Sequence, residues 1–419
     1  MAEEPSAIGR RRFLKTVGVL GVSSILASAD ALGAEGRAGK IKEQKSELPQ
    51  VPRRKLGKTG VEVSCLALGT IFDVMEKQTV LRNAVKWGVT YWDTAPDYAG
   101  PNSELGIGKF IAANPDIRKK LFISTKASDA VTIADIEKAL QASLKRLNTD
   151  YIDLYHVMDR VVGEGYTGHG LSDPAQLTDE LKDWVKSAKK RKLIRFFGFP
   201  THQNIPECLT TAAKLDWIDV VMFMYNFRLM QDAKIAAAID ACHKVGIGLV
   251  AMKTQARRII SDKDKKLTEH FMQQDFTEGQ AKIKVVLEDK RFSSACVRME
   301  NIAVLTENVA ASLDKTKLSQ ADMEVFKEYA SATRSSYCAG CAHICDSALS
   351  DVLCVGDIMR YLMYYNSYGD QARARQLFAQ IPDQIKDKLL STDYGPAEAR
   401  CPQRLPIGKL VAEAFSKLV

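Results

Sequence analysis

From Val51 onward, short apolar segments alternate with amphipathic segments in a regular order, and this alternation constrains the fold more than any other feature of the chain. The apolar segments have the length of strands, and each is followed by a segment with apolar residues at helical spacing. The predicted strands begin near Leu66, Thr90, Leu121, Tyr151, Ile194, Val220, Gly248 and Ser294. Eight strand–helix units in about 260 residues match the count and size of a (β/α)8 TIM barrel, so we expect this α/β fold.

The segments between these strands are predicted helices, and a short hairpin is expected before the first strand. The hairpin would pair Arg54–Leu56 with Val61–Ser64. The predicted helices are Gln78–Trp87, Ser103–Ala113, Ile133–Leu147, Thr178–Arg191, Pro206–Lys214, Lys234–Val245, Gly279–Glu288 and Ile302–Ala311. An open, doubly wound sheet is the main alternative, but no glycine-rich dinucleotide fingerprint follows the first strand.

The N-terminal segment has the features of an export signal rather than of a folded element. Arg10–Ala29 begins with arginines followed by Phe-Leu-Lys, continues with a short apolar stretch and ends in small residues. It resembles a twin-arginine signal, with Gly9 where Ser or Thr is usual. We therefore expect a signal peptide over 1–34, a linker over 35–50, and export to the periplasm by the twin-arginine translocase. A short amphipathic helix is the alternative, and the apolar stretch is too short to span a membrane.

The net charge of +8 does not indicate a nucleic-acid partner. Basic residues outside the N-terminal segment alternate with acidic ones at helical spacing, as in Lys182–Lys192. Such patterns are typical of solvated helix faces. We expect no nucleic-acid binding and no integral membrane span in the mature chain.

Four polar side chains lie at or just beyond the carboxyl ends of predicted strands: Asp93, Tyr98, Lys126 and His156. Catalytic residues of a β/α barrel collect at this face. An ammonium beside a phenol lowers its pKa, so Lys126 would make Tyr98 a usable proton donor. Asp93 would keep Lys126 charged, and His156 would orient a substrate oxygen. Each residue alone has a structural explanation, but the four together indicate carbonyl reduction.

At this point the chain resembles the aldo-keto reductase family. The resemblance covers residues 53 to about 312 and includes Arg-Lys-Leu-Gly-Lys-Thr-Gly, Asp93-Thr94-Ala95, Ser103-Glu104 and Thr306-Glu307-Asn308-Val309, besides the four residues above. It implies a barrel domain over 51–315 that binds NADP or NAD, with hydride transfer to a carbonyl or sugar substrate and Tyr98 as general acid.

The cofactor contacts that the resemblance implies are only partly present. The Ser-Asn pair expected after the fifth strand is replaced by Pro200-Thr201, and the Gln of the sixth strand is missing. Thr201, His202 or Asn226 would have to substitute. Lys253 is expected near the pyrophosphate. The remaining positions carried over are Arg298 and Met299 at the adenosine phosphate and Glu307 and Asn308 at the adenine. A guanidinium suits a phosphate, which favours NADP over NAD.

Five of the nine cysteines lie beyond residue 337, in a region that we predict to be a helical iron–sulfur domain over 316–419. Cys338-x2-Cys341-x3-Cys345 is followed by Cys401-Pro402, which is similar to the C-terminal extension of iron–sulfur aldo-keto reductases. The resemblance implies a 4Fe-4S cluster held by Cys338, Cys341, Cys345 and Cys401, with Cys354 in reserve. Zinc with His343 and disulfides are the alternatives. The other four cysteines are expected in the core.

Together these patterns predict an exported, nicotinamide-dependent oxidoreductase that carries an accessory cluster. Because free nicotinamide is not expected outside the cytoplasm, we expect tight cofactor binding before export. Either an internal redox cycle or an electron-transfer partner would then complete turnover. A low-turnover redox-sensing or binding module on the same fold is the alternative, and so is an enzyme whose cysteines hold structural zinc.

Overall fold

The computed structural model describes residues 48–419 except 129, 131, 163–165, 170, 172, 257–261, 275 and 351–353. The predicted signal and most of the predicted linker lie outside the described residues. Within the described ranges, no helix is both long enough and apolar enough to cross a membrane.

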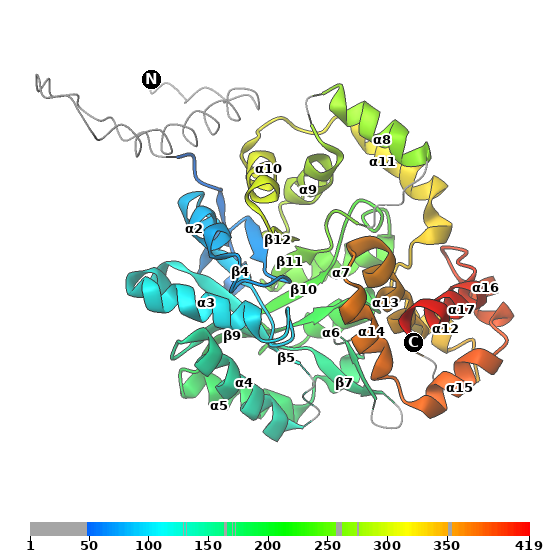
Figure 1. The fold of residues 1–419 in the computed structure, drawn as a ribbon, viewed down its shortest axis with the longest axis horizontal. Coiled ribbons are helices and arrows are strands. Elements are labelled where there is room, and N and C mark those ends of the chain that lie inside the picture. Colours follow the sequence, from blue (N-terminus) through cyan, green and yellow to red (C-terminus); the bar gives the residue numbers. More distant parts are fainter. Residues whose placement is uncertain are drawn as a thin grey trace, which may run out of the picture.

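Eight parallel strands close into a barrel, which confirms the predicted fold (Figure 1). Their order around the barrel is β10-β11-β12-β3-β4-β5-β6-β9. Their bounds are β3 Leu66–Gly69, β4 Tyr91–Asp93, β5 Phe122–Ala127, β6 Ile152–Val157, β9 Ile194–Thr201, β10 Val220–Met224, β11 Gly248–Met252 and β12 Ser294–Arg298. Every predicted strand start lies within about one residue of the observed one.

The predicted helices are all present around this barrel. They are α2 Gln78–Lys86, α3 Asn102–Ala113, α4 Ile133–Leu147, α5 Asp179–Lys190, α6 Ile205–Ala212, α7 Ala233–Lys244, α9 Glu278–Glu288 and α10 Ile302–Leu313. Local sequence explains their ends. The Thr132 hydroxyl accepts from the backbone N–H of Asp135 at the start of α4, and Asn148 ends this helix in the left-handed conformation.

A short antiparallel hairpin closes the amino end of the barrel. It pairs β1 Arg53–Lys55 with β2 Glu62–Ser64, as predicted. Leu56 and Val63 of this hairpin are fully buried and belong to the cluster that fills the barrel interior. The opposite, carboxyl end of the strands is therefore the open end.

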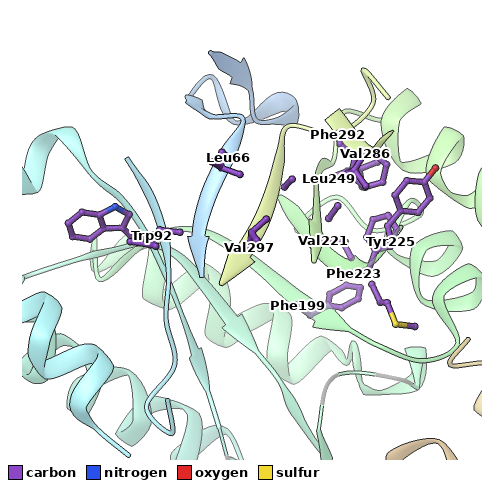
Figure 2. Packing of buried hydrophobic residues seen from close by; sticks show 14 of the residues in the cluster. Leu66, Trp92, Phe199, Val221, Phe223, Tyr225, Leu249, Val286, Phe292 and Val297 are labelled. Atoms are coloured by element: carbon purple, nitrogen blue, oxygen red, sulfur yellow. The ribbon is translucent and has the colours of Figure 1, made fainter. Parts of the chain in front are cut away.

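The larger core lies between the strands and the surrounding helices. Figure 2 shows some of its side chains on β3, β4, β9, β10, β11 and β12 and on the neighbouring α9. Aromatic rings fill much of this layer. The Tyr225 and Phe292 rings stack with centroids 4.5 Å apart, and Phe223 lies 5.5 Å from Phe292.

Two features differ from the sequence prediction. The segment after β6, expected to be a loop, forms an antiparallel hairpin of β7 Asp159–Val162 and β8 Tyr166–His169. An additional helix, α8 Asp262–Met272, follows β11. Its sequence is strongly charged, so only Leu267 and Phe271, four residues apart and both buried, indicate a helix that packs on the core.

The C-terminal region is helical. It comprises α11 Gln320–Ala332, α12 Ala342–Asp346, α13 Val355–Tyr368, α14 Gln371–Ala379, α15 Asp383–Ser391, α16 Gly395–Arg400 and α17 Ile407–Leu418. Phe326 and Tyr329 of α11 belong to the barrel's larger core, whereas Cys345–Leu418 contributes a separate core of its own. The domain boundary at residue 315 stays a prediction, and this packing favours a division after α11.

The C-terminal region is attached to the barrel at the loop after β9. Gly340 adopts φ +78° and its carbonyl accepts a hydrogen bond of 2.7 Å from the Asn204 backbone N–H. A Cβ atom at Gly340 would lie 2.1 Å from the His202 carbonyl oxygen, so the two backbones meet without room for a side chain. Beside this contact, Gln203 donates a 2.8 Å hydrogen bond to Asp357 of α13.

Candidate active site

A cavity of about 400 Å³ opens at the carboxyl end of the barrel strands. We call it the barrel-mouth cavity. Strand ends form one part of its wall, and α13 and the start of α14 form the other. The polar residues that line it are Asp93, Tyr98, Lys126, His202, Lys253, Thr254, Gln255, Arg298, Glu300, Tyr364, Ser367, Tyr368, Asp370 and Arg373. A cavity of this size, largely apolar with a few convergent polar groups, is typical of a small-molecule site.

Asp93 and Lys126 form a buried ion pair at the base of this cavity. The Lys126 ammonium donates to both Asp93 carboxylate oxygens, at 3.0 and 2.9 Å, and to the Thr94 carbonyl at 2.7 Å. Both side chains are almost fully buried, at 3% and 4% exposure for Lys126 and Asp93. Burial is the largest single effect on Lys126 and opposes its charge, but the Asp93 carboxylate and the Tyr98 phenol together raise the pKa of the ammonium. Lys126 is therefore charged at neutral pH.

Tyr98 lies over this pair, as the sequence predicts. The Lys126 Nζ is 4.8 Å from the centroid of the Tyr98 ring. Loss of solvent raises the pKa of the Tyr98 phenol, and Lys126 and then Arg373 lower it only in part, so the net direction is upward. The expectation of a lowered pKa is therefore wrong for the cavity without ligands. Tyr98 carries its proton at neutral pH, and its role as proton donor stays a prediction.

His156 is close to this group but is not among the described residues that line the cavity. It is fully buried on β6, in register with Lys126 on one side and Gly198 on the other. Burial, and then the Lys126 charge, lowers its pKa well below the ordinary value, so the ring is neutral. Its contact with a substrate oxygen stays a prediction, whereas His202 does line the cavity.

Of the predicted cofactor residues, Lys253 and Arg298 line the cavity, and so does His202, one of the three candidates for the missing nicotinamide contacts. Thr201 is buried and its hydroxyl donates to the Gln203 carbonyl at 2.7 Å. The Asn226 amide donates to the Lys253 carbonyl and to the Tyr337 hydroxyl, at 3.2 and 3.0 Å. Thr201 and Asn226 thus already take part in hydrogen bonds within the protein, and their contact with the nicotinamide stays a prediction. The remaining predicted residues, Met299, Glu307 and Asn308, lie outside the lining.

The contribution of α13 and α14 to the cavity is larger than the sequence indicates. Tyr364, Ser367, Tyr368, Asp370 and Arg373 all line it. The sequence predicts that the C-terminal region contributes to the pocket, but its helical stretch rich in Tyr and Arg between Cys345 and Cys401 does not say which of its residues do so. The Arg373 guanidinium forms a 2.6 Å ion pair with Asp97 and lies 5.3 Å from the centroid of the Tyr98 ring. The C-terminal region therefore completes the site around Tyr98.

A second, smaller cavity brings four cysteines together. We call it the cysteine cavity. Cys338, Cys341, Cys345 and Cys401 all line it, with Gln403 as the one other polar side chain among the described lining residues. Burial, and then the neighbouring thiols, raises the pKa of Cys345, and burial raises that of Cys341 to about 11. These mutual effects require the thiols to be close together.

The alternatives for these cysteines find less support. All nine cysteines lie in the described part of the chain, and none forms a disulfide. Cys354 is buried at the start of α13 but does not line the cysteine cavity. His343 is held by Asn204, with 2.8 Å between Nδ1 and the amide oxygen. Among the described residues, no group of three His, Cys, Asp or Glu is arranged to hold one metal ion, and this includes the four cysteines of the cysteine cavity. The other four cysteines are buried, as predicted.

Fold and site define a β/α-barrel oxidoreductase with a tyrosine, a lysine and an aspartate at the carboxyl end of its strands. A family model described as aldo/keto reductase family matches residues 67–331, and the chain belongs to this family. The match ends before Cys338, so the cysteine cavity and α13–α17 lie beyond it.

Relatives and solved structures agree with this membership. L-galactose dehydrogenase of Arabidopsis thaliana is 24% identical over 309 residues, which is 67% of this chain and 94% of that protein. The uncharacterised oxidoreductase YrpG of Bacillus subtilis is 26% identical over 232 residues, 50% of this chain and 68% of that protein. The thermostable aldo-keto reductase Tm1743, solved with the inhibitor epalrestat, is 26% identical with a TM-score of 0.54, over 66% of this chain and 99% of that one.

Proposed function

We propose that this protein is a nicotinamide-dependent carbonyl or alcohol oxidoreductase in which Tyr98 is the general acid. The observation that carries the proposal is the buried Asp93–Lys126 pair beneath the Tyr98 ring in the barrel-mouth cavity. Three side chains in this arrangement provide a protonated phenol, a cation to stabilise its conjugate base and an anion to keep that cation charged.

The proton chemistry follows from these side chains. A reduced nicotinamide supplies the hydride when it is bound. Tyr98 gives its proton to the substrate oxygen as negative charge develops there, and the resulting phenolate is stabilised by the Lys126 ammonium. The Asp93 carboxylate holds Lys126 in place by accepting two hydrogen bonds from its ammonium. In the direction of alcohol oxidation, the Tyr98 phenolate accepts the proton instead.

The cavity fits the phosphate part of the cofactor better than its nicotinamide part. Arg298, at the end of β12, lines the cavity, is more than one third exposed and is paired with Glu300, so a phosphate would compete with this carboxylate for the guanidinium. Asn308 lies outside the cavity lining, but its buried side-chain Nδ2 has no hydrogen-bond partner, which is compatible with its predicted contact to an adenine. NADP would be held on this side. The carboxamide contacts differ from the family pattern, because Thr201 and Asn226 already take part in hydrogen bonds within the protein.

We further propose that Cys338, Cys341, Cys345 and Cys401 hold a 4Fe-4S cluster. Four thiols around one apolar cavity provide the donor set that such a cluster requires. The cluster supplies one-electron transfer when bound, so an electron-transfer partner is part of the proposal. Zinc with His343 is less consistent with this arrangement, because Asn204 holds the His343 ring outside the cysteine cavity.

Export is the remaining part of the proposal. It depends on the sequence of residues 1–34, since this segment lies outside the described residues. The twin-arginine translocase carries folded proteins, so both cofactors would be acquired before export to the periplasm. Replacing Arg10 and Arg11 by lysine should keep the protein in the cytoplasmic fraction, and unchanged periplasmic recovery would contradict the export route.

The substitution Tyr98→Phe tests the catalytic proposal. Removal of the general acid should lower the rate of NADPH-dependent reduction of a test aldehyde by about 10²- to 10⁴-fold. Binding of NADPH, followed by fluorescence, controls for folding and should change little. A wild-type protein that binds NADPH tightly but reduces no aldehyde or ketone would instead favour the redox-sensing or binding module.

A further inference from the structure

One part of the barrel-mouth cavity is not used by the proposed proton transfer. It is the wall where the end of β11 meets α13, and it contains Lys253, Thr254, Tyr364 and Ser367. We call it the β11–α13 wall. Its first two residues come from the barrel and its last two from the C-terminal region, beyond the match to the family model.

Lys253 is held in this wall at a cost to stability. Its ammonium is 3.5 Å from the Tyr364 hydroxyl and 4.6 and 5.0 Å from the ring centroids of Tyr364 and Tyr368. No carboxylate forms an ion pair with it among the residues that the structure describes. Its backbone has φ +54°, in the left-handed region that non-glycine residues rarely adopt. Strain of this kind, and a partly buried cation without an anion, are typical of functional positions.

Two hydroxyl groups beside Lys253 have no hydrogen-bond partner. Thr254 is 1% exposed, and its Oγ1 is buried without a partner. The Oγ of Ser367 on α13 is also buried without a partner. Both residues line the cavity. Because buried polar atoms are almost always hydrogen-bonded in native proteins, these hydroxyls indicate that a ligand completes the wall.

The charges around this wall favour an anion. Lys253 contributes an ammonium, and the Tyr364, Thr254 and Ser367 hydroxyls are additional donors. The Arg373 guanidinium lines the same cavity and lies 5.3 Å from the centroid of the Tyr98 ring. These donors line the same cavity as the proton-donating residue Tyr98. An anionic oxygen group at this wall would belong to the molecule that Tyr98 protonates.

We propose that the β11–α13 wall binds a carboxylate of the substrate, so that the enzyme acts on a carbonyl or alcohol compound that carries a carboxylate group. This inference rests on the proposed function for the identity of the reacting oxygen. It assigns Lys253 to the substrate and not to the cofactor pyrophosphate. Arg298, on β12, remains available for the cofactor phosphates.

Binding of a matched pair of probes to the full-length protein tests this assignment. D-gluconate carries a carboxylate, whereas D-glucitol is a neutral polyol of the same length. By calorimetry, without cofactor, gluconate should bind the wild-type protein on the order of 10- to 100-fold more tightly than glucitol, as expected for charge-assisted hydrogen bonds in a buried site. Equal affinity for the two probes would overturn the proposal.

Single substitutions test whether gluconate binds at the β11–α13 wall. Lys253→Met should remove most of the preference for gluconate, and Thr254→Val and Tyr364→Phe should each reduce it. Thr254→Val and Tyr364→Phe nearly preserve the side-chain size, so they still test the wall if Lys253→Met fails to fold. Lys244→Met, at an exposed lysine of α7, is the matched control and should keep the full preference. Retention of the full preference in Lys253→Met and in Tyr364→Phe would contradict the assigned wall.

Adenosine 2′,5′-bisphosphate distinguishes the two sources of an anion. If Lys253→Met weakens binding of this cofactor fragment but leaves the gluconate preference intact, the wall serves the cofactor phosphates and the proposal fails. The readout is binding and not turnover, so it is separate from the Tyr98→Phe test. Selective gluconate binding by a protein that reduces no carbonyl would contradict the proposed reaction while supporting the anion site.

Discussion

Arg373 of α14 lies 5.3 Å from the centroid of the Tyr98 ring and holds Asp97, the residue before Tyr98, in a 2.6 Å ion pair. It also donates to the Asp97 carbonyl at 3.2 Å. The Lys126 ammonium approaches the same ring at 4.8 Å. Two cations thus act on one phenol, one from the barrel and one from the C-terminal region. The acid strength of Tyr98 depends on both parts of the chain.

Replacing Arg373 by glutamine should change the pH dependence of the reaction. Loss of solvent raises the pKa of Tyr98, and Lys126 and Arg373 lower it in part, so removing one cation raises it further. Alcohol oxidation needs the phenolate, which exists above this pKa. In a plot of kcat/KM for a test alcohol against pH, the rise in rate should therefore occur at a higher pH in Arg373→Gln than in the wild type. Arg373→Lys keeps the charge and should shift the profile less, whereas equal shifts would indicate a purely structural role.

Asp93→Asn should be costly for both stability and activity. It leaves the Lys126 ammonium buried at 3% exposure without its anion. Breaking a buried pair in this way costs about 3–5 kcal/mol. The pKa of Lys126, which Asp93 now raises, should fall, so the lysine supports the Tyr98 phenolate less well.

Thermal unfolding and aldehyde reduction check this prediction. The temperature of unfolding and the rate of aldehyde reduction should both decrease strongly in Asp93→Asn. Asp116 is exposed, so Asp116→Asn is the control and should behave like the wild type. An Asp93→Asn protein with the wild-type reduction rate would show that Lys126 does not need its partner.

Visible absorption of the anaerobically purified protein checks the cysteine cavity. A 4Fe-4S protein should show broad absorption that bleaches with dithionite. Cys341→Ala should lose this absorption, because Cys341 lines the cavity. Cys354→Ala should retain it, because Cys354 is buried but does not line the cavity. A colourless wild-type protein, or loss of colour only in Cys354→Ala, would contradict the predicted ligands.

The barrel could be predicted from the sequence because its signals are local. Each strand is a short apolar segment followed by its own amphipathic helix. The length of the apolar segments and the helical spacing of apolar residues are therefore sufficient to predict the strand–helix units. Asp93 and Lys126 stand at strand ends, and parallel strands bring such positions to the same end of the barrel. The structure confirms their contact at 2.9 Å.

The rest of the site depends on contacts that no local pattern encodes. Asn226 was a candidate for the nicotinamide, but its amide donates to the Tyr337 hydroxyl, 111 residues away in sequence. Arg373 reaches Asp97 across 276 residues. A helix rich in Tyr and Arg indicates an amphipathic surface but does not say which cavity it covers. Packing between the barrel and the C-terminal region decides this.

Gly340→Ala should weaken the attachment of the C-terminal region to the barrel more than the comparable substitution Gly369→Ala does. Gly340 and Gly369 both have positive φ, +78° and +67°, so alanine at either position costs about 1–2 kcal/mol through the backbone alone. At Gly369 no atom lies within 4 Å of the added Cβ, whereas at Gly340 the His202 carbonyl oxygen lies at 2.1 Å. Gly340→Ala should therefore lower the free energy of unfolding by about 2 kcal/mol more than Gly369→Ala does, as measured by thermal unfolding.

Gly340→Ala should also slow aldehyde reduction more than Gly369→Ala does, because the clash lies where the helices that carry Tyr364 and Arg373 are attached to the barrel. Equal losses in the two variants would show that the contact at Gly340 does not position these helices.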